Sequence, residues 1–318
     1  MAQTLAEPGG ELGRSVAARP RVYALLALGV VCLAFSAMFV RWSAVPGTVS
    51  AGYRLAIAVV ALAPIFARRL ARGQVPRAPR LWLLAGVAGI FFALDLAFWN
   101  TSLFLTSAAT STFLVYDAPI VVGLGTLLIF HERPGGAFWR GLALALVGMG
   151  VMAGREMLAG GTASAAAGVG DVLALAGGAC YGGYLLMTGR LRARMDAVAT
   201  LWISGLAGAV LLLAVNLVER QALWGFSSRT VLALLGLGLV TQVGGWLAIN
   251  DALGHLPASI VSVTLLGQPV LTAVLAEPLL GQPLEAQQVL GGALVLGGIY
   301  LVNRGFAQRQ NAPPPGPP

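Results

Sequence analysis

The sequence contains no lysine, only two cysteines and two histidines, and few charged residues of either sign. Charged residues make up 10% of its 318 residues, whereas a soluble domain is usually about 25% charged. A chain that is 58% hydrophobic, with a mean hydropathy of +0.82, cannot hide so many apolar side chains in a soluble core. The composition excludes a disordered, collagen-like or disulfide-scaffold protein, and it predicts an integral membrane protein.

Several chemical signatures are also absent. The chain has no HExxH, GxSxG or Walker A motif, and neither His131 nor His255 has a second histidine at metal-ligand spacing. We therefore expect no enzymatic activity, no cofactor and no metal. Cys32 and Cys180 lie inside apolar runs, where they should pack as small residues. All 20 basic residues are arginines in small groups without interleaved aromatic residues, which argues against nucleic-acid binding.

Long apolar runs predict an all-α integral membrane fold with ten transmembrane helices, because one span needs about 20 apolar residues. The expected spans are residues 22–41, 49–67, 81–101, 107–130, 137–154, 170–189, 198–218, 230–250, 257–280 and 285–303. Residues 1–21 are expected to form a disordered cytoplasmic tail, residues 155–169 an external linker, and residues 304–318 a Pro-rich cytoplasmic tail.

The distribution of arginine predicts the orientation. If the N-terminus is cytoplasmic, fifteen arginines fall in cytoplasmic segments and only Arg41, Arg155, Arg220 and Arg229 fall outside. Basic residues are retained on the cytoplasmic side. We therefore expect a multi-pass protein of the cytoplasmic (inner) membrane with both termini in the cytoplasm.

The chain matches itself at an offset of about 150 residues. Asn100 matches Asn250, Pro119 matches Pro269, and the run that begins at Gly141 matches residues 291–298 at several positions. Two repeats, residues 22–154 and 170–303, then hold five helices each. Because five is an odd number, the second repeat enters the membrane from the opposite side, so the two halves are inverted. Inverted repeats are typical of secondary transporters, which hold their substrate near the midplane between the halves.

Pro119 and Pro269 are expected in the middle of the fourth and ninth spans. A proline inside a helix removes one backbone hydrogen bond and bends the helix. Two interpretations stay open: kinks that serve packing alone, or hinges that line a cavity and allow rocking. The matched positions favour the hinges.

Three charged residues, Arg54, Asp95 and Asp117, fall inside expected spans. Charges in a bilayer are costly and usually face a cavity or a partner. Either Arg54 forms a structural ion pair with one of the two carboxylates, or a carboxylate is left to bind a substrate amine or to carry a proton.

Polar and aromatic side chains at helical spacing predict four stripes, which should face inward because amides facing lipid would be unsatisfied. The stripes are Asp95–Trp99–Ser102, Tyr181–Tyr184–Thr188, Gln242–Trp246–Asn250 and Thr264–Gln268–Thr272. They either line a cavity or join helices by hydrogen bonds. The candidate substrate-binding residues are Arg54, Asp95, Trp99, Asn100, Tyr116, Asp117, Tyr184, Gln242, Trp246, Asn250 and Gln268.

Nearly the whole chain, residues 22–303, resembles the EamA-like family of the drug/metabolite transporter superfamily. The resemblance is carried by FVRWSAVPGTVSAGYRLAIA (39–58), LTSAATSTFLVYDAPIVVGLGTLLIFHERP (105–134), GLALALVGMGVMAG (141–154), GDVLALAGGACYGGYLLMTGRL (170–191), LPASIVSVTLLGQPVLTAVLAEPLLGQPL (256–284) and GGALVLGGIYLV (291–302). Family members typically carry a Gly-Glu pair after the fourth and ninth helices, which here reads His131-Glu132 and Gly281-Gln282. Arg54 matches an arginine often seen in the family's second helix, whereas Asp95 and Asp117 do not carry over.

The resemblance implies an inverted five-plus-five repeat with both termini cytoplasmic. It also implies outward movement of amino acids or related small polar metabolites by alternating access. We expect a small-molecule substrate, a lipid bilayer around the protein, coupling to a proton or a counter-solute, and a monomer or homodimer. Two alternatives stay open. One is efflux of drugs, antimetabolites or quaternary amines by the same fold; the other is a non-transporting protein of membrane assembly or lipid handling.

Overall fold

The computed structural model describes residues 9–102, 105–106, 108–159 and 165–311, and all regular elements in these ranges are helices. Ten helical stretches of the described chain are long and apolar enough to cross a membrane, which confirms the expected fold class. Six of these spans are continuous helices: α3 (Gly47–Ala71), α4 (Pro79–Ser102), α7 (Gly136–Ala159), α8 (Ala165–Arg192), α9 (Ala197–Val218) and α14 (Ala286–Asn311).

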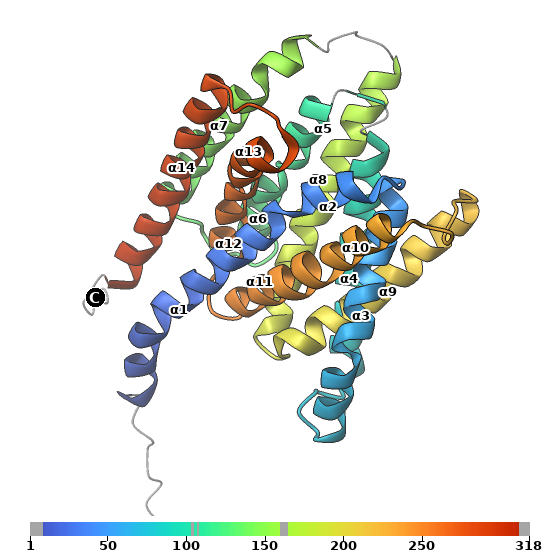
Figure 1. The fold of residues 1–318 in the computed structure, drawn as a ribbon. Helices are drawn as coiled ribbons and strands as arrows, with labels where there is room; N and C mark the ends of the chain where they lie inside the picture. Colours follow the sequence, from blue (N-terminus) through green and yellow to red (C-terminus); the bar gives the residue numbers. More distant parts are fainter. Residues whose placement is uncertain (1–8, 103–104, 107, 160–164, 312–318) are drawn as a thin grey trace, which may run out of the picture.

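The other four spans are built from shorter helices that follow one another (Figure 1). They are α1 (Gly9–Ala34) with α2 (Ser36–Ser43), α5 (Ala108–Val115) with α6 (Ala118–Leu128), α10 (Ser228–Gly236) with the π-helix η1 (Leu237–Gly245) and α11 (Trp246–Leu253), and α12 (Ala258–Leu265) with α13 (Gly267–Leu280).

The helices are longer than the apolar runs that predict them. Helix α1 begins at Gly9, inside the tail expected to be disordered, and α14 continues to Asn311. Likewise α7 and α8 extend into the expected linker. Good helix formers such as Ala, Glu and Arg flank the spans, so the helices do not end at the apolar boundary. The remaining parts of these segments, residues 1–8, 160–164 and 312–318, and residue 107 of the fourth expected span lie outside the described residues.

An even number of spans places the start of α1 and the end of α14 at the same end of the bundle, toward the lower left of Figure 1. We call this the terminal end and the opposite one the far end. By chain direction, α8 and α11 finish at the terminal end, whereas α4 and α9 finish at the far end.

Contacts between glycines show that equivalent helices of the two repeats are antiparallel. A β carbon added at Gly141 would lie 2.5 Å from the carbonyl oxygen of Gly298, and one at Gly148 would lie 2.5 Å from that of Gly291. The beginning of α7 therefore meets the end of α14, and the two backbones touch. Gly141 and Gly291 are repeat equivalents, as are Gly148 and Gly298, so this contact has the symmetry of an inverted repeat.

The pairing of α3 with α9 obeys the same symmetry. At the terminal end Arg69 Nη1 lies 2.6 Å from Asp196 Oδ1, and at the far end Thr48 donates to Glu219 Oε2 at 3.3 Å. Each pair joins the beginning of one helix to the end of the other, which is the order that an antiparallel pair requires. The pair at the terminal end joins two charged side chains, whereas at the far end a neutral hydroxyl donates to a carboxylate.

The two prolines expected in mid-helix stand in the first turn of a second half-helix. The fourth span breaks at Tyr116 and Asp117, two residues before Pro119, and the ninth breaks at Leu266, three residues before Pro269. Each span nevertheless continues across its break, because Asp117 and Leu266 keep right-handed helical backbone angles. The prolines therefore stand inside the spans as expected, and their role as hinges stays a prediction. Proline lacks the N–H that would bond backward and is tolerated where a helix begins, so each chain turn ends one helix and starts the next.

The turns that follow these half-helices explain the Gly-Glu signature. His131 and Gly281 have φ of 56° and 65°, the left-handed region that favours glycine. The next N–H groups close the turn, from Glu132 to Thr126 at 3.0 Å and from Gln282 to the equivalent carbonyl at 3.3 Å. The pattern thus specifies a helix end, and His131 keeps it without the glycine.

Candidate functional site

Arg54 and Gln242 meet in the interior of the bundle. Arg54 lies seven residues into α3, roughly 10 Å from its start at the usual rise per residue. Its Nε donates to Oε1 of Gln242 at 2.6 Å, and its Cζ lies 5.6 Å from the centroid of the Phe92 ring. Gln242 is 1% exposed and belongs to η1. A π-helix is rare and is frequently found at functional sites.

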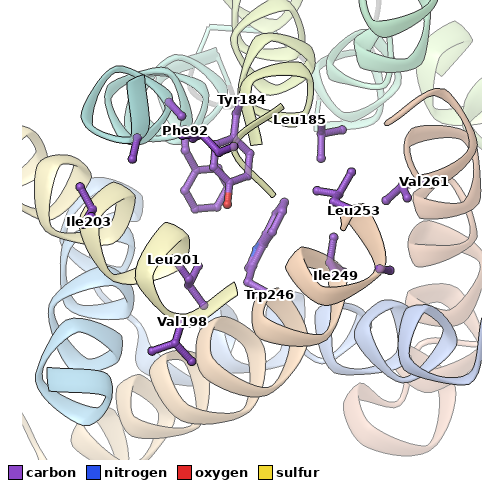
Figure 2. Close-up of a cluster of buried hydrophobic side chains, with 14 of the residues drawn as sticks. Phe92, Tyr184, Leu185, Val198, Leu201, Ile203, Trp246, Ile249, Leu253 and Val261 are labelled. Atoms are coloured by element: carbon purple, nitrogen blue, oxygen red, sulfur yellow. The ribbon is translucent and has the colours of Figure 1, made fainter. Parts of the chain in front are cut away.

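Phe92, which lies under Arg54, belongs to a group of four aromatic rings. Figure 2 shows Phe92, Tyr184 and Trp246 pointing toward one another from α4, α8 and α11. The ring centroids of Phe92 and Tyr184 are 4.7 Å apart, and Trp246 lies edge-on to both, at 4.9 and 5.1 Å. Tyr181 contacts Trp246 at 5.9 Å. We call Arg54, Gln242, Phe92, Tyr181, Tyr184 and Trp246 the central cluster.

Asn250 extends the central cluster toward the terminal end. Its Nδ2 donates to the Tyr184 hydroxyl at 3.4 Å and to the Trp246 carbonyl at 2.9 Å. Trp246 and Asn250 thus face α8 from α11, whereas Gln242 faces Arg54 of α3 from η1. The neighbouring stripe behaves in the same way, because Tyr181 and Tyr184 reach this cluster from α8.

Two carboxylates lie against α8 one turn before Tyr181. A β carbon at Gly177 would lie 3.6 Å from Oδ1 of Asp95, and one at Gly178 would lie 1.8 Å from Oδ1 of Asp117. The two glycines leave the room that these side chains occupy. Asp95 interacts electrostatically with Arg54, Asp117 and Tyr116. Within the described part of the chain, neither carboxylate forms a salt bridge within 4.0 Å of Arg54, so the expected alternative of a direct ion pair is not what this structure contains.

Several buried polar atoms near the cluster have no hydrogen-bond partner. In most proteins such atoms are few, and each needs an explanation, such as an unseen water or ligand. Of the described side chains, those with unpartnered buried atoms include Trp99 (Nε1), Asp117 (Oδ1), Thr188 (Oγ1), Trp246 (Nε1) and Asn250 (Oδ1). All five belong to the stripes or the candidate residues named from the sequence.

The structure does not bring every candidate to the central cluster. Asn100 packs on Gly47 at the far end, where a β carbon at Gly47 would lie 2.7 Å from its Oδ1. Because the repeats are inverted, Asn100 and its equivalent Asn250 lie toward opposite ends. Gln268 is half-buried in the first turn of α13. In the fourth stripe Thr272 donates to the Ala34 carbonyl at 3.2 Å, which is interhelical hydrogen bonding.

Sequence reasoning missed Phe92, and it left Tyr181 outside the candidate set. Phe92 stands at the repeat position that Gln242 occupies in the second half, which is a signal that could have identified it. An apolar residue in an apolar helix otherwise carries none.

The central cluster is closed in this structure. Trp246 is 1% exposed and Tyr184 is fully buried. Two cavities among the described residues lie elsewhere. One of about 250 Å³ is at the terminal end between α6, α7, α12 and α14, and one of about 230 Å³ lies between α3 and α9 toward the far end.

Comparison with known proteins matches both halves of the chain to one family model. The model of the EamA-like transporter family matches residues 20–154 and again residues 168–304. The chain is 30% identical over 273 residues to a probable terminal-alkyne amino-acid exporter of Streptantibioticus cattleyicolor, covering 83% of this chain and 86% of that protein. It is 24% identical over 233 residues to the uncharacterized transporter YwfM of Bacillus subtilis, covering 73% and 76%. A solved crystal structure shares the fold with a TM-score of 0.75 at 22% identity, covering 92% of this chain and 99% of that one.

Proposed function

The chain belongs to the EamA-like transporter family, and on that premise we propose that it exports amino acids or related small polar metabolites. Its substrate site is the central cluster together with Asp95 and Asp117. Transport proceeds by alternating access, with the inverted halves opening this site first to the cytoplasm and then to the outside. Both termini, and hence the terminal end, face the cytoplasm, in agreement with the arginine bias.

The observation that carries the proposal is that Arg54 is separated from Asp95 and Asp117 beside the aromatic rings of the central cluster. Among the described side chains, Arg54 donates through its Nε to Gln242, Asp117 Oδ1 is buried without a hydrogen-bond partner, and Asp95 forms no ion pair within 4.0 Å. A zwitterion matches this arrangement. Its carboxylate suits a guanidinium, which offers planar paired donors. Its ammonium group suits the two aspartates, and its side chain contacts the aromatic rings.

The broken spans supply the remaining elements. Half-helices that begin near the midplane, such as α6 and α13, are typical of transporter sites. Pro119 and Pro269 fix the starts of both and act as the hinges. One of the two aspartates exchanges a proton or binds a counter-solute to couple transport. The printed name of the Streptantibioticus relative supports the amino-acid class.

A cationic drug or quaternary amine is the second candidate. Four aromatic rings around a buried site resemble the cages that bind such cations. Arg54 argues against it, because its guanidinium already lies over Phe92 and would repel a second cation.

Flux into liposomes tests the proposal. Purified protein is reconstituted, and uptake of labelled amino acids is compared with that of labelled tetraethylammonium, with and without a proton gradient. We expect amino-acid flux, and a loss of at least about tenfold in Arg54→Gln and in Asp95→Asn, because each removes one charge of the site. Arg229→Gln, an exposed arginine outside the site, is the matched control. Absence of flux for every amino acid, or equal flux in all variants, overturns the proposal; flux of the cation alone supports the second candidate.

A further inference from the structure

The cavity at the terminal end has an apolar floor and a basic mouth. Its floor is formed by Phe138, Ile260, Val302 and Phe306. Glu132, Arg133 and Arg309 stand at its mouth and are exposed. With about 250 Å³ of space, it is large enough for part of an amphiphile.

The charges at the mouth do not cancel. Glu132 Oε1 accepts from Arg190 Nη2 at 2.9 Å, so the one carboxylate of the cavity is already neutralised by an arginine outside it. Neither Arg133 nor Arg309 takes part in an ion pair with a described residue.

Arg309 is held in place over the chain turn that precedes α7. A β carbon at Gly135 would lie 2.3 Å from its Cζ, and its Nη1 donates to the Arg133 carbonyl at 3.4 Å. Its guanidinium therefore stands beside Arg133 at the mouth. Two helices, α7 and α12, begin at the cavity and add the positive ends of their dipoles.

The cavity lies at the level where spans leave the membrane. The end of α6 beside it exposes Leu128 and Ile129, by 68% and 66%, as expected for side chains that face lipid. A basic pocket between helices at this depth fits a lipid headgroup better than a freely dissolved anion, which would gain nothing from the apolar floor.

The repeat sharpens this assignment. At the equivalent positions of the other half, Pro283 replaces Arg133 and Ala159 replaces Arg309. The pair of arginines is therefore a feature of the second and first repeats at this end only, and the duplication of the chain does not account for it.

From these observations we propose that the cavity between α6, α7, α12 and α14 binds the phosphate headgroup of an anionic membrane lipid. Arg133 and Arg309 hold the phosphate by charge-assisted hydrogen bonds, and the first carbons of an acyl chain lie on the apolar floor.

Lipid-dependent thermal stability tests the proposal without any transport assay. The full chain in a neutral detergent is titrated with phosphatidylglycerol, phosphatidylcholine or inorganic phosphate, and the unfolding temperature is followed. We expect phosphatidylglycerol to raise it, and the other two to leave it unchanged. The double variant Arg133→Gln/Arg309→Gln should bind phosphatidylglycerol at least about tenfold more weakly, since two charge-assisted contacts are lost.

The matched control is Arg140→Gln/Arg304→Gln. It removes the same charge from α7 and α14 near the same end, and neither arginine lines the cavity. Equal weakening in both double variants would reduce the effect to general surface charge and overturn the proposal, as would no weakening in either. Equal stabilisation by inorganic phosphate would show a site for the free anion and would also overturn it. Because all four side chains are exposed, the unfolding temperatures without lipid should be the same for each protein.

Discussion

Arg192 ties the end of α8 to the backbone of Asn250. Its Nε donates to the Asn250 carbonyl at 2.7 Å, Nη1 donates to the Met195 carbonyl, and Nη2 lies 3.8 Å from Asp251 Oδ1. The Asn250 side chain bonds in turn to Tyr184. One arginine, 9% exposed, thus closes the terminal end directly beneath the central cluster.

We expect Arg192→Gln to lower the unfolding free energy by about 1–3 kcal/mol, because two carbonyls lose their donor. The measurement is thermal unfolding of the purified protein in detergent, followed by tryptophan fluorescence. Arg194→Gln, an exposed arginine two residues away, is the control and should unfold like the unmodified protein. If both variants unfold at the same temperature, the contacts of Arg192 do not contribute to stability.

Gln242→Glu should separate stability from transport. The new carboxylate would stand where Oε1 now accepts from Arg54 and would form a buried ion pair with it. We expect the unfolding temperature to stay level or rise, while amino-acid flux falls by at least about tenfold because Arg54 no longer attracts a substrate carboxylate. Gln242→Leu, by contrast, leaves the Arg54 Nε unpaired and should lower both. Retained flux in the glutamate variant contradicts the assigned role of Arg54.

Gly148→Ala should destabilise the protein, since its β carbon would lie 2.5 Å from a backbone oxygen of α14 that cannot move aside alone. Overpacking of this kind typically costs about 1–3 kcal/mol. Gly154→Ala, in the same helix, has no neighbour within 4 Å of the added carbon and should be neutral or slightly stabilising. The measurement is thermal unfolding of the two variants under the same conditions. An unaltered Gly148→Ala protein would mean that α7 and α14 do not touch as described.

Asp196 has two roles that substitution can separate. Its Oδ1 accepts from the N–H groups of Val198 and Ala199 as the N-cap of α9, and it also pairs with Arg69. Asp196→Asn keeps the cap and loses the partly exposed pair, so the loss should be under about 1 kcal/mol. Asp196→Ala loses both the cap and the ion pair, so its unfolding free energy should fall by about 1 kcal/mol more than that of Asp196→Asn.

Salt distinguishes the two contributions of Asp196. The difference between the unmodified protein and Asp196→Asn should shrink at high ionic strength, whereas the difference between the asparagine and alanine variants should persist. Unfolding measured in low and in molar salt provides the comparison. If Asp196→Asn and Asp196→Ala lose the same unfolding free energy at low salt, the N-cap of α9 does not contribute to stability.

Apolar runs and matched positions were sufficient to predict ten spans and their inverted order, because the bilayer demands long helices and duplication leaves matching residues. They could not show where a span breaks. Pro119 and Pro269 marked the right places, but the sequence does not distinguish a bent helix from one that ends and restarts. The π-helix also left no signal beyond the glycines that flank Gln242.

The candidate site was predictable in part. Spacing along one helix correctly grouped Gln242, Trp246 and Asn250, because such residues share a face. It could not tell which faces of different helices meet. Arg54 was therefore offered Asp95 or Asp117 as a partner, whereas the structure pairs it with Gln242. Asn100 was expected to line the same cavity as Asn250. Arg192 was counted only as a loop charge, since its contacts are with backbone carbonyls that no pattern records.

The glycine contact of α7 with α14 has a consequence for how such a protein can move. Backbones that touch have no intervening layer of side chains over which to slide, so this pair should keep its geometry whether the carrier faces in or out. Rearrangement then falls to the other eight spans of the described chain, which turn against a static pair. Spectroscopic labels placed on α7 and α14 should report a constant separation throughout the cycle, and labels on α4 and α11 a changing one.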